Sequence, residues 1–189
     1  MLLRAMNAKD HGFTKWSLGL LPDIIVNDAL DVGCGGGVAL RLIGARFPEA
    51  SLSGIDISEE SVRFAMGHNR SAVAEGRCSI VQGGVSSLPY GEGAFDLVTA
   101  FETHYFWPSL DDDLAEVVRV LRPGGVAMLV ANLYPHPDFD ARNARFERRF
   151  GFRLTPVPEL CSILESLGCE VIAHLDERRN WMCVIGIRR

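Results

Sequence analysis

The sequence lacks the features that mark several classes of protein. Its five cysteines are odd in number and form no C-x-x-C pair, which argues against a disulfide framework and against a cysteine-based zinc site. No apolar run approaches the roughly 18 residues that a membrane span needs, and no linker or internal repeat divides the chain. We therefore expect one soluble, cytoplasmic domain with reduced cysteines, no membrane partner and no bound metal.

Basic charge is also scarce. The 189 residues contain 19 Lys and Arg against 24 Asp and Glu, which gives a net charge of −5, and no basic block exceeds a pair of arginines. Such a surface attracts a phosphate backbone poorly, so nucleic acid is not an expected partner. The chain does contain 48% apolar residues, enough for a sizeable core in a domain of this length.

Short apolar runs alternate with longer amphipathic runs along the chain. This pattern predicts strands at 29–32, 52–57, 78–82, 95–100, 126–131, 170–175 and 181–187, and helices at 38–47, 58–71, 110–121 and 158–167. Strands that alternate with helices imply right-handed crossovers and a mostly parallel α/β sheet with helices on both faces. In such sheets a ligand binds beyond the carboxyl ends of the strands.

A glycine-rich loop follows the first predicted strand, where residues 31–37 read DVGCGGG. Glycines permit positive φ and let a ligand approach the backbone without meeting a Cβ. Val38 stands where a G-x-G-x-x-G loop needs its last glycine, which counts against a nicotinamide-dependent oxidoreductase. Asp56 lies 19 residues beyond Gly37, at the end of the second predicted strand, where its carboxylate can accept hydrogen bonds from both ribose hydroxyls. A plainer interpretation makes Asp56 a helix cap ahead of Ser58.

Four segments together resemble the class I S-adenosylmethionine-dependent methyltransferases. In order and spacing they match the family's glycine loop, second-strand acid, fourth strand and turn into the fifth strand: LDVGCGGG at 30–37, GIDIS at 54–58, FDLV at 95–98 and LRPGG at 121–125. The resemblance implies a Rossmann-like three-layer sandwich around a seven-stranded, mostly parallel sheet in the order 3-2-1-4-5-7-6, with the last strand antiparallel. It also implies S-adenosylmethionine as the cofactor and a single methyltransferase domain over residues 1–189.

The resemblance assigns cofactor contacts residue by residue. The family's loop contacts the methionine part of the cofactor with backbone atoms, which belong here to Gly33, Cys34 and Gly35. Asp31 is expected beneath the loop, Asp56 on the ribose and Ile57 against the adenine. Where the family often has an acid for the adenine amino group, this chain has a glycine, so the adenine edge falls to backbone groups or a hydroxyl among Gly84, Val85 and Ser86.

The phrase FETHYFWP at 101–108 follows the fourth predicted strand, beside the expected methyl group. Methyl transfer from a sulfonium is an in-line displacement that needs alignment and exclusion of water, and it requires no metal. Phe101 is expected to contact the cofactor. A hydroxyl or protonated amine acceptor needs a general base, and His104, which ordinarily titrates near neutral pH, and Glu102 are the candidates. Tyr105 either positions the acceptor or packs, and the plainer alternatives are a structural histidine and core aromatic residues.

Two segments outside these motifs are expected to cover the site. Residues 1–27, with Met6 and Trp16, are interpreted as an N-terminal helical lid or as a plain helix. Residues 133–155 are long for a bare connection and rich in aromatic residues, which predicts a substrate lid. A run of arginines in this segment either attracts an acidic substrate or forms an ordinary solvated helix face: Arg142, Arg145, Arg148 and Arg149.

The leading functional hypothesis is an S-adenosylmethionine-dependent methyltransferase that acts on a small molecule. The expected catalytic fold takes up about 160 of the 189 residues, from Asp28 onward, which leaves only the first 27 residues and the segment 133–155 to recognise an acceptor. One alternative is a protein or nucleic-acid methyltransferase, which the acidic balance and the lack of an appended recognition domain weaken. The other is a non-catalytic module that binds the cofactor without turnover.

Overall fold

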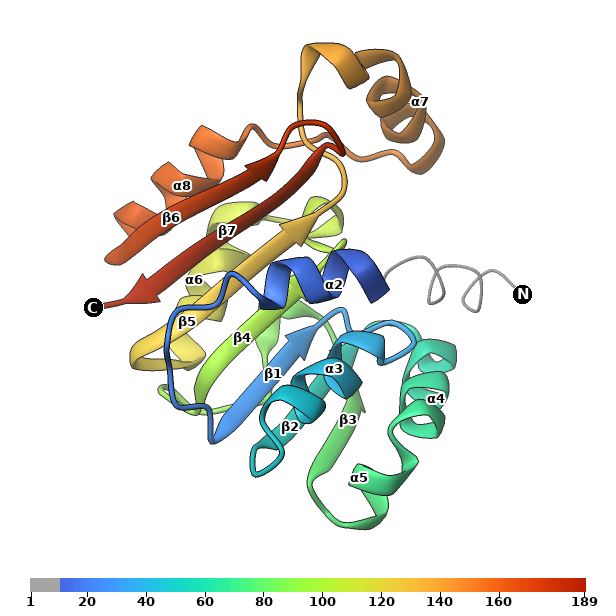
Figure 1. Ribbon diagram of the computed structural model, residues 1–189, viewed down its shortest axis with the longest axis vertical. Helices are drawn as coiled ribbons and strands as arrows, with labels where there is room; N and C mark the ends of the chain where they lie inside the picture. Colours follow the sequence, from blue (N-terminus) through green and yellow to red (C-terminus); the bar gives the residue numbers. More distant parts are fainter. Residues whose placement is uncertain (1–10) are drawn as a thin grey trace.

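The computed structural model describes residues 11–189 and shows a sheet covered by helices on both faces (Figure 1). The strands are β1 (Asp28–Val32), β2 (Ser51–Asp56), β3 (Cys78–Gln82), β4 (Phe95–Phe101), β5 (Leu121–Ala131), β6 (Cys169–Asp176) and β7 (Trp181–Arg188). The α-helices are α2 (His11–Leu18), α3 (Val38–Arg46), α4 (Glu59–His68), α5 (Arg70–Ala74), α6 (Leu110–Val120), α7 (Asp140–Phe150) and α8 (Val157–Ser166). Short 3-10 turns are η1 (Val85–Ser87), η2 (His104–Phe106) and η3 (Pro137–Phe139).

The sheet has the order β3-β2-β1-β4-β5-β7-β6. Strands β1 to β5 pair in parallel, and β7 runs antiparallel to both of its neighbours, β5 and β6. The predicted fold, with its strand order and its antiparallel last strand, is therefore confirmed. None of the helices described over residues 11–189 is both long enough and apolar enough to cross a membrane.

Apolar side chains fill both faces of the sheet. On one face Leu40 and Ile43 of α3 are completely buried against β1 and β2, and α2 and α4 extend the same cluster. On the other face Leu114 of α6 and Leu160 of α8 are equally buried. Burial on both sides explains why the central strands are continuous apolar runs rather than alternating ones. The loops at the strand ends are thereby held by a rigid framework.

The helix predicted over 58–71 is divided in two, which corrects that prediction. It begins as expected, because the Ser58 side chain caps α4. It is interrupted at Asn69, a buried residue whose side-chain amide donates to the carbonyls of Ala65, at 2.9 Å, and of Gly37, at 3.0 Å. Asn69 therefore ties the end of α4 to the glycine-rich loop instead of continuing the helix.

The segment 133–155 contains α7, which stands beyond the carboxyl ends of the strands (Figure 1). Side-chain amides fix it to the sheet: those of Asn143 and Asn180 donate to the Tyr134 carbonyl at 2.8 and 3.0 Å. Arg142 adds hydrogen bonds to the side-chain oxygen of Asn180 and to the carbonyl of Asn132. The predicted long connection is thus a helix held by a polar network rather than by an apolar core.

Helix α2 packs on the sheet through aromatic residues. Trp16 lies 5.5 Å from Trp181 of β7 and 6.2 Å from Phe13, measured between ring centroids. Met6, part of the predicted N-terminal lid, lies outside the described residues, and the lid over 1–27 stays a prediction.

Arg122 joins the amino ends of three strands. Its guanidinium lies 2.8 Å from carboxylate oxygens of both Asp28, at the start of β1, and Asp96 in β4. Asp96 in turn accepts hydrogen bonds from the backbone amides of Asn27 and Asp28. The charged residues of the FDLV and LRPGG segments therefore stabilise the sheet at the edge opposite the glycine-rich loop.

Replacing Arg122 should lower the stability of the protein without changing the glycine-rich loop, which lies at the other end of the strands. We expect Arg122→Gln to reduce the free energy of unfolding by about 1 kcal/mol, because two partly exposed ion pairs are lost and solvent already screens them. Arg63→Gln, an exposed arginine on α4, is the control and should change stability by less than about 0.5 kcal/mol. Urea unfolding measures both changes in stability. Equal effects of the two substitutions would contradict a stabilising role for the ion pairs of Arg122 with Asp28 and Asp96.

Candidate functional site

The glycine-rich loop is joined to the end of β2 by backbone hydrogen bonds. The amides of Gly33 and Cys34 both donate to the carbonyl of Ile55, at 2.8 and 3.0 Å. The next amide, of Gly35, donates to the carboxylate of Asp56 at 2.8 Å. The loop and the acid, 21 residues apart in sequence, therefore meet at one point of the sheet edge, as the sequence predicts.

Two glycines of this loop have opposite surroundings. Both have positive φ, +50° at Gly35 and +77° at Gly37. A Cβ at Gly37 would lie 2.9 Å from the Cα of Ala65, so the position is closed by helix packing. A Cβ at Gly35 would meet nothing within 4 Å. The backbone at Gly35 thus faces open space, which is the geometry that lets a ligand approach closely.

Asp56 is not a helix cap, so that plainer interpretation is wrong. The cap of α4 is Ser58, whose hydroxyl accepts from the backbone of α4, while Asp56 accepts from the Ser58 amide at 2.9 Å. Its neighbour Ile57 is 76% exposed, an unusual place for a large apolar side chain. Gly84 lies beside it, because a Cβ there would be 3.6 Å from Ile57. A carboxylate and an exposed apolar surface therefore adjoin the loop.

The other residues predicted around the adenine are placed by η1. Val85 is buried among apolar side chains, and Ser86 is exposed at the surface of the same turn. The hydroxyl of Ser86 and the backbone of Gly84 are therefore accessible, whereas the side chain of Val85 is not.

Asp31 lies beneath the loop and is almost completely buried. Its carboxylate accepts a hydrogen bond of 2.6 Å from the Thr99 hydroxyl, which joins β1 to β4. Burial and the Asp56 charge raise the pKa of Asp31 to about 7, although the Thr99 hydrogen bond opposes this shift. The thiol of Cys34 is also buried, and burial raises its pKa, so Cys34 offers its backbone rather than a reactive sulfur.

At the end of β4, Glu102 holds two strands together. It has a positive φ of 58°, a strained conformation for a residue with a side chain. Its carboxylate accepts hydrogen bonds from the Tyr105 hydroxyl, at 3.0 Å, and from the backbone amide of Asn132 after β5. Phe101, the last residue of β4, is partly buried against the core. Glu102 is thus engaged in positioning its neighbours.

His104 is buried, with only 2% of its surface exposed. Its Nδ1 atom has no hydrogen-bond partner within the described part of the chain. Burial lowers its pKa to about 4, so the expectation that it titrates near neutrality is wrong. At physiological pH His104 is therefore a neutral imidazole, which makes it a weak base.

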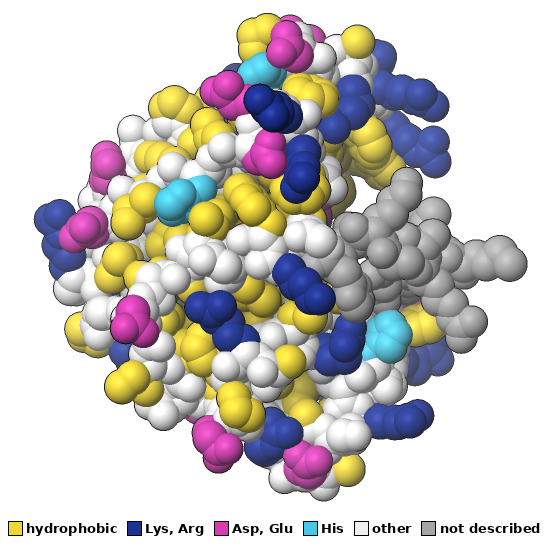
Figure 2. All heavy atoms as spheres, in the orientation of Figure 1, with side chains coloured by type: hydrophobic (Ala, Val, Ile, Leu, Met, Phe, Trp, Pro, Cys, Tyr) yellow, Lys and Arg dark blue, Asp and Glu magenta, His cyan; other side chains and the backbone are white. Residues whose placement is uncertain are grey.

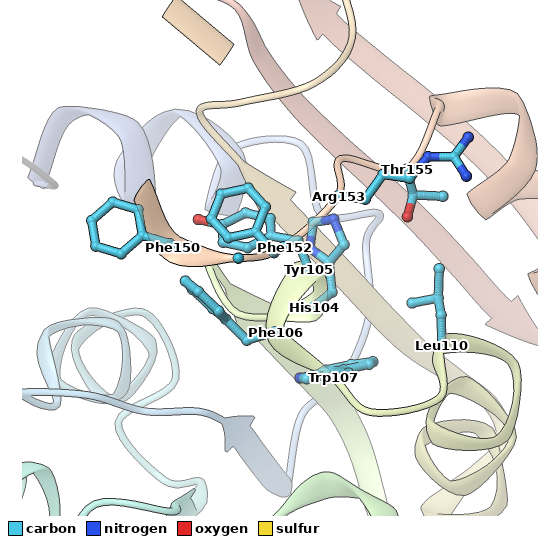
Figure 3. A pocket seen from close by; sticks show the side chains of 10 residues that line it. His104, Tyr105, Phe106, Trp107, Leu110, Phe150, Phe152, Arg153 and Thr155 are labelled. Carbon is cyan, nitrogen blue, oxygen red and sulfur yellow. The ribbon is translucent and has the colours of Figure 1, made fainter. Parts of the chain in front are cut away.

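A cavity of about 470 Å³ opens between η2 and the segment after α7 (Figure 3). Its lining includes His104, Tyr105, Phe106 and Trp107 from one side of the chain and Phe150, Phe152, Arg153 and Thr155 from the other. Phe106 is 54% exposed, so core packing does not account for it, whereas Trp107 packs against the core.

Two residues, Trp107 and Thr103, link the cavity to the glycine-rich loop. Trp107 donates a hydrogen bond of 3.3 Å to the hydroxyl of Thr103. Thr103 also lies so close to Gly33 that a Cβ there would collide with its side chain. The cavity-lining residues Phe150, Phe152, Arg153 and Thr155 lie within the segment 133–155 that is predicted as a substrate lid, but the sequence predicts none of them individually as a site residue.

The two loop glycines should respond differently to alanine. We expect Gly35→Ala to lower the free energy of unfolding by about 1 to 2 kcal/mol, the cost of left-handed backbone alone. Gly37→Ala adds the overlap with Ala65 and should cost about 2 to 5 kcal/mol. Chemical denaturation measures both. Equal losses would show that the surroundings of the two glycines do not differ as described.

Buried His104 should make stability depend on pH. Its folded pKa of about 4 lies below the ordinary value of about 6.5, so the unfolded chain binds more protons and stability falls as pH is lowered between these values. We expect wild type to lose on the order of 3 kcal/mol relative to His104→Asn between pH 7 and 4.

Urea unfolding of both proteins across this range measures the difference. The control is His136→Asn, which makes the same replacement at a partly exposed histidine. A constant difference between wild type and His104→Asn would contradict a buried neutral imidazole.

Comparison with known proteins gives the fold and site a family. A family model described as a methyltransferase domain matches residues 29–125. 24-methylenesterol C-methyltransferase 2 of Oryza sativa is 35% identical over 154 residues, which cover 78% of this chain and 42% of that protein. Fatty-acid O-methyltransferase of Mycolicibacterium smegmatis is 34% identical over 103 residues, 54% of this chain and 36% of that protein. The chain spans less than half the length of these two relatives.

A solved structure of similar fold is geranyl diphosphate methyltransferase in complex with S-adenosylmethionine. It has a TM-score of 0.75 at 15% identity and covers 98% of this chain and 86% of that chain. The open backbone at Gly35, the carboxylate of Asp56 and the exposed side chain of Ile57 fit a nucleoside with a charged amino-acid tail. The family match, the strand order and this fit agree, and the chain belongs to the class I S-adenosylmethionine-dependent methyltransferases.

Proposed function

We propose that this chain transfers a methyl group from S-adenosylmethionine to a small-molecule acceptor held beyond the carboxyl ends of β4 and β5. The observation that carries the proposal is that the glycine-rich loop and the cavity beside η2 are linked through two residues. Thr103 touches Gly33 of the loop and accepts a hydrogen bond from Trp107, which lines the cavity. A donor on the loop and an acceptor in the cavity would therefore lie side by side, as in-line transfer requires.

The cofactor would be held mainly by backbone and by one carboxylate. Asp56 already accepts one amide hydrogen bond on each oxygen, and each oxygen has a further lone pair for a ribose hydroxyl. The loop backbone from Gly33 to Gly35 would contact the methionine part. The exposed side chain of Ile57 would pack against the adenine, whose edge faces Gly84 and Ser86.

When bound, S-adenosylmethionine supplies an electrophilic methyl group on a sulfonium. The chain's residues then have to orient the acceptor and exclude water. Phe101, at the end of β4, would contact the donor. The Glu102 carboxylate holds the ring of Tyr105 by accepting a hydrogen bond from the Tyr105 hydroxyl. We assign His104 a positioning role rather than that of a general base, because burial keeps its imidazole neutral and makes it a weak base.

The volume of the cavity and the substrates in the names of the relatives both favour a small acceptor. A cavity of about 470 Å³ has the size of a site for one small organic molecule. The two relatives named above are, by name, methyltransferases of a sterol and of a fatty acid. The net charge of −5 does not favour a nucleic-acid acceptor.

Loss of the Asp56 carboxylate should weaken cofactor binding. We expect Asp56→Ala to bind S-adenosylmethionine about tenfold more weakly or worse, because hydrogen bonds to a charged group are lost. Asp56→Asn keeps one acceptor oxygen and should lose less. Titration calorimetry measures the affinity, and Glu60→Ala, an exposed acid in the first turn of α4, is the control that should match wild type.

The same titrations separate the hypotheses. No affinity for S-adenosylmethionine in wild type would contradict the proposed function, and unchanged affinity in Asp56→Ala would contradict the ribose assignment. Transfer of a labelled methyl group into a pool of small metabolites tests turnover. Tight binding without transfer to any of them would favour the non-catalytic module instead.

A further inference from the structure

The cavity beside η2 is lined by an array of aromatic rings. Tyr105 stacks on Phe152 with ring centroids 4.6 Å apart, and Phe106 meets Phe152 edge-on at 5.0 Å. Phe150 continues the array 6.3 Å beyond Phe152, and Phe146 lies 5.9 Å beyond Phe150. Figure 3 shows the rings of Phe106, Phe150 and Phe152 gathered at one side of the pocket.

These rings are not hidden from water. Phe106, Phe146 and Phe150 are 54%, 38% and 50% exposed. Single exposed apolar residues are common on proteins, but a connected group of them around a cavity marks a binding surface. The array therefore offers an apolar and partly flat surface that a ligand can cover.

The rim of the array is basic. Residues 140–153 hold five arginines against two acids, Asp140 and Glu147, in a chain whose net charge is −5. Arg142 is used internally, where it bonds to Asn132 and Asn180. The remaining four form no ion pair with any residue in the described part of the chain: Arg145, Arg148, Arg149 and Arg153. Figure 2 shows basic side chains gathered next to apolar ones around α7.

This arrangement selects for charge as well as for apolar surface. The guanidinium of Arg149 lies 5.4 Å from the ring centre of Phe150, so cationic and apolar groups are presented together. The arginines would repel a cationic ligand, and a neutral ligand would gain no electrostatic attraction from them. An anionic group joined to an apolar body satisfies both features.

We propose that this cavity binds an anionic amphiphile, a free small molecule with an apolar body and a carboxylate or phosphate. The apolar body lies along Tyr105, Phe106 and Phe152, and the anionic group faces the arginines of α7. The inference rests on the proposed function, because the cavity is the acceptor site named there. It adds the chemical class of the acceptor.

Binding of single-chain probes tests the inference without requiring turnover. Decanoate and decyl phosphate are titrated calorimetrically below their micelle concentrations, with decanol and decyltrimethylammonium as neutral and cationic counterparts. We expect the anions to bind about tenfold more tightly than either counterpart, and a difference between the two anions identifies the preferred head group.

Two variants assign the site. Phe106→Ala removes an exposed ring and should weaken decanoate and decanol alike. The double variant Arg148→Gln with Arg149→Gln should weaken only the anions, by about fivefold, as expected for two solvent-screened charges. The control is the double variant Arg63→Gln with Arg70→Gln, on α4 and α5, which pack beside the outer strand β3. It makes the same change in charge and should leave the affinities for all four probes unchanged.

The inference is overturned if decanol or the cation binds as tightly as the anions, or if the α7 double variant binds anions as wild type does. Binding to anionic vesicles in the absence of binding to the free probes would indicate a membrane surface and would also overturn it. S-adenosylmethionine affinity is measured on the same samples. If wild type binds S-adenosylmethionine but none of the amphiphiles, this inference alone is rejected. If wild type does not bind S-adenosylmethionine, the proposed function is rejected.

Discussion

The site depends on the parallel pairing of β1 with β2. This register aligns Val32 with Ile55, so the residues that follow each strand meet at the same edge. The amide of Gly35 can then donate to the Asp56 carboxylate, and this hydrogen bond holds the glycine-rich loop against the end of β2. Burial of Asp31 against Thr99 ties the same loop to β4, where the acceptor side begins. The glycine-rich loop is thereby joined by hydrogen bonds to the end of β2 and to β4.

Much of this framework could be predicted from the sequence, because its causes are local. Glycines at 33, 35 and 37 and the acid at 56 act through backbone conformation and one hydrogen bond, which short motifs record. The break in the helix at Asn69 could not be predicted, since it arises from a contact with Gly37, more than 30 residues earlier. Propensity favours a continuous helix there, and the tertiary contact overrides it.

The acceptor side is less visible in the sequence. Tyr105 and Phe152 are separated by 47 residues and stack only because α7 folds back over η2. His104 has the residue type of a general base, but its burial, which no sequence pattern records, makes it a neutral group. Arginines at helical spacing favour an ordinary solvated face, with attraction of an acidic substrate as the alternative. Most of them are exposed, as a solvated face requires, and the adjoining aromatic rings are what support the proposed anionic amphiphile.

The two halves of the site also differ in what holds them. The cofactor side is built on strands and helices with completely buried apolar side chains, so it tolerates little change. The acceptor side is attached through a polar network in which Arg142 and Glu102 both bond to the backbone of Asn132. Substitutions on the exposed face of α7 touch neither that network nor the core. If the acceptor site lies where we propose it, substitutions along α7 would change acceptor preference while the glycine-rich loop and Asp56 keep their geometry. Short motifs then predict the cofactor and not the acceptor, because the cofactor contacts are local in sequence and the proposed acceptor contacts are not.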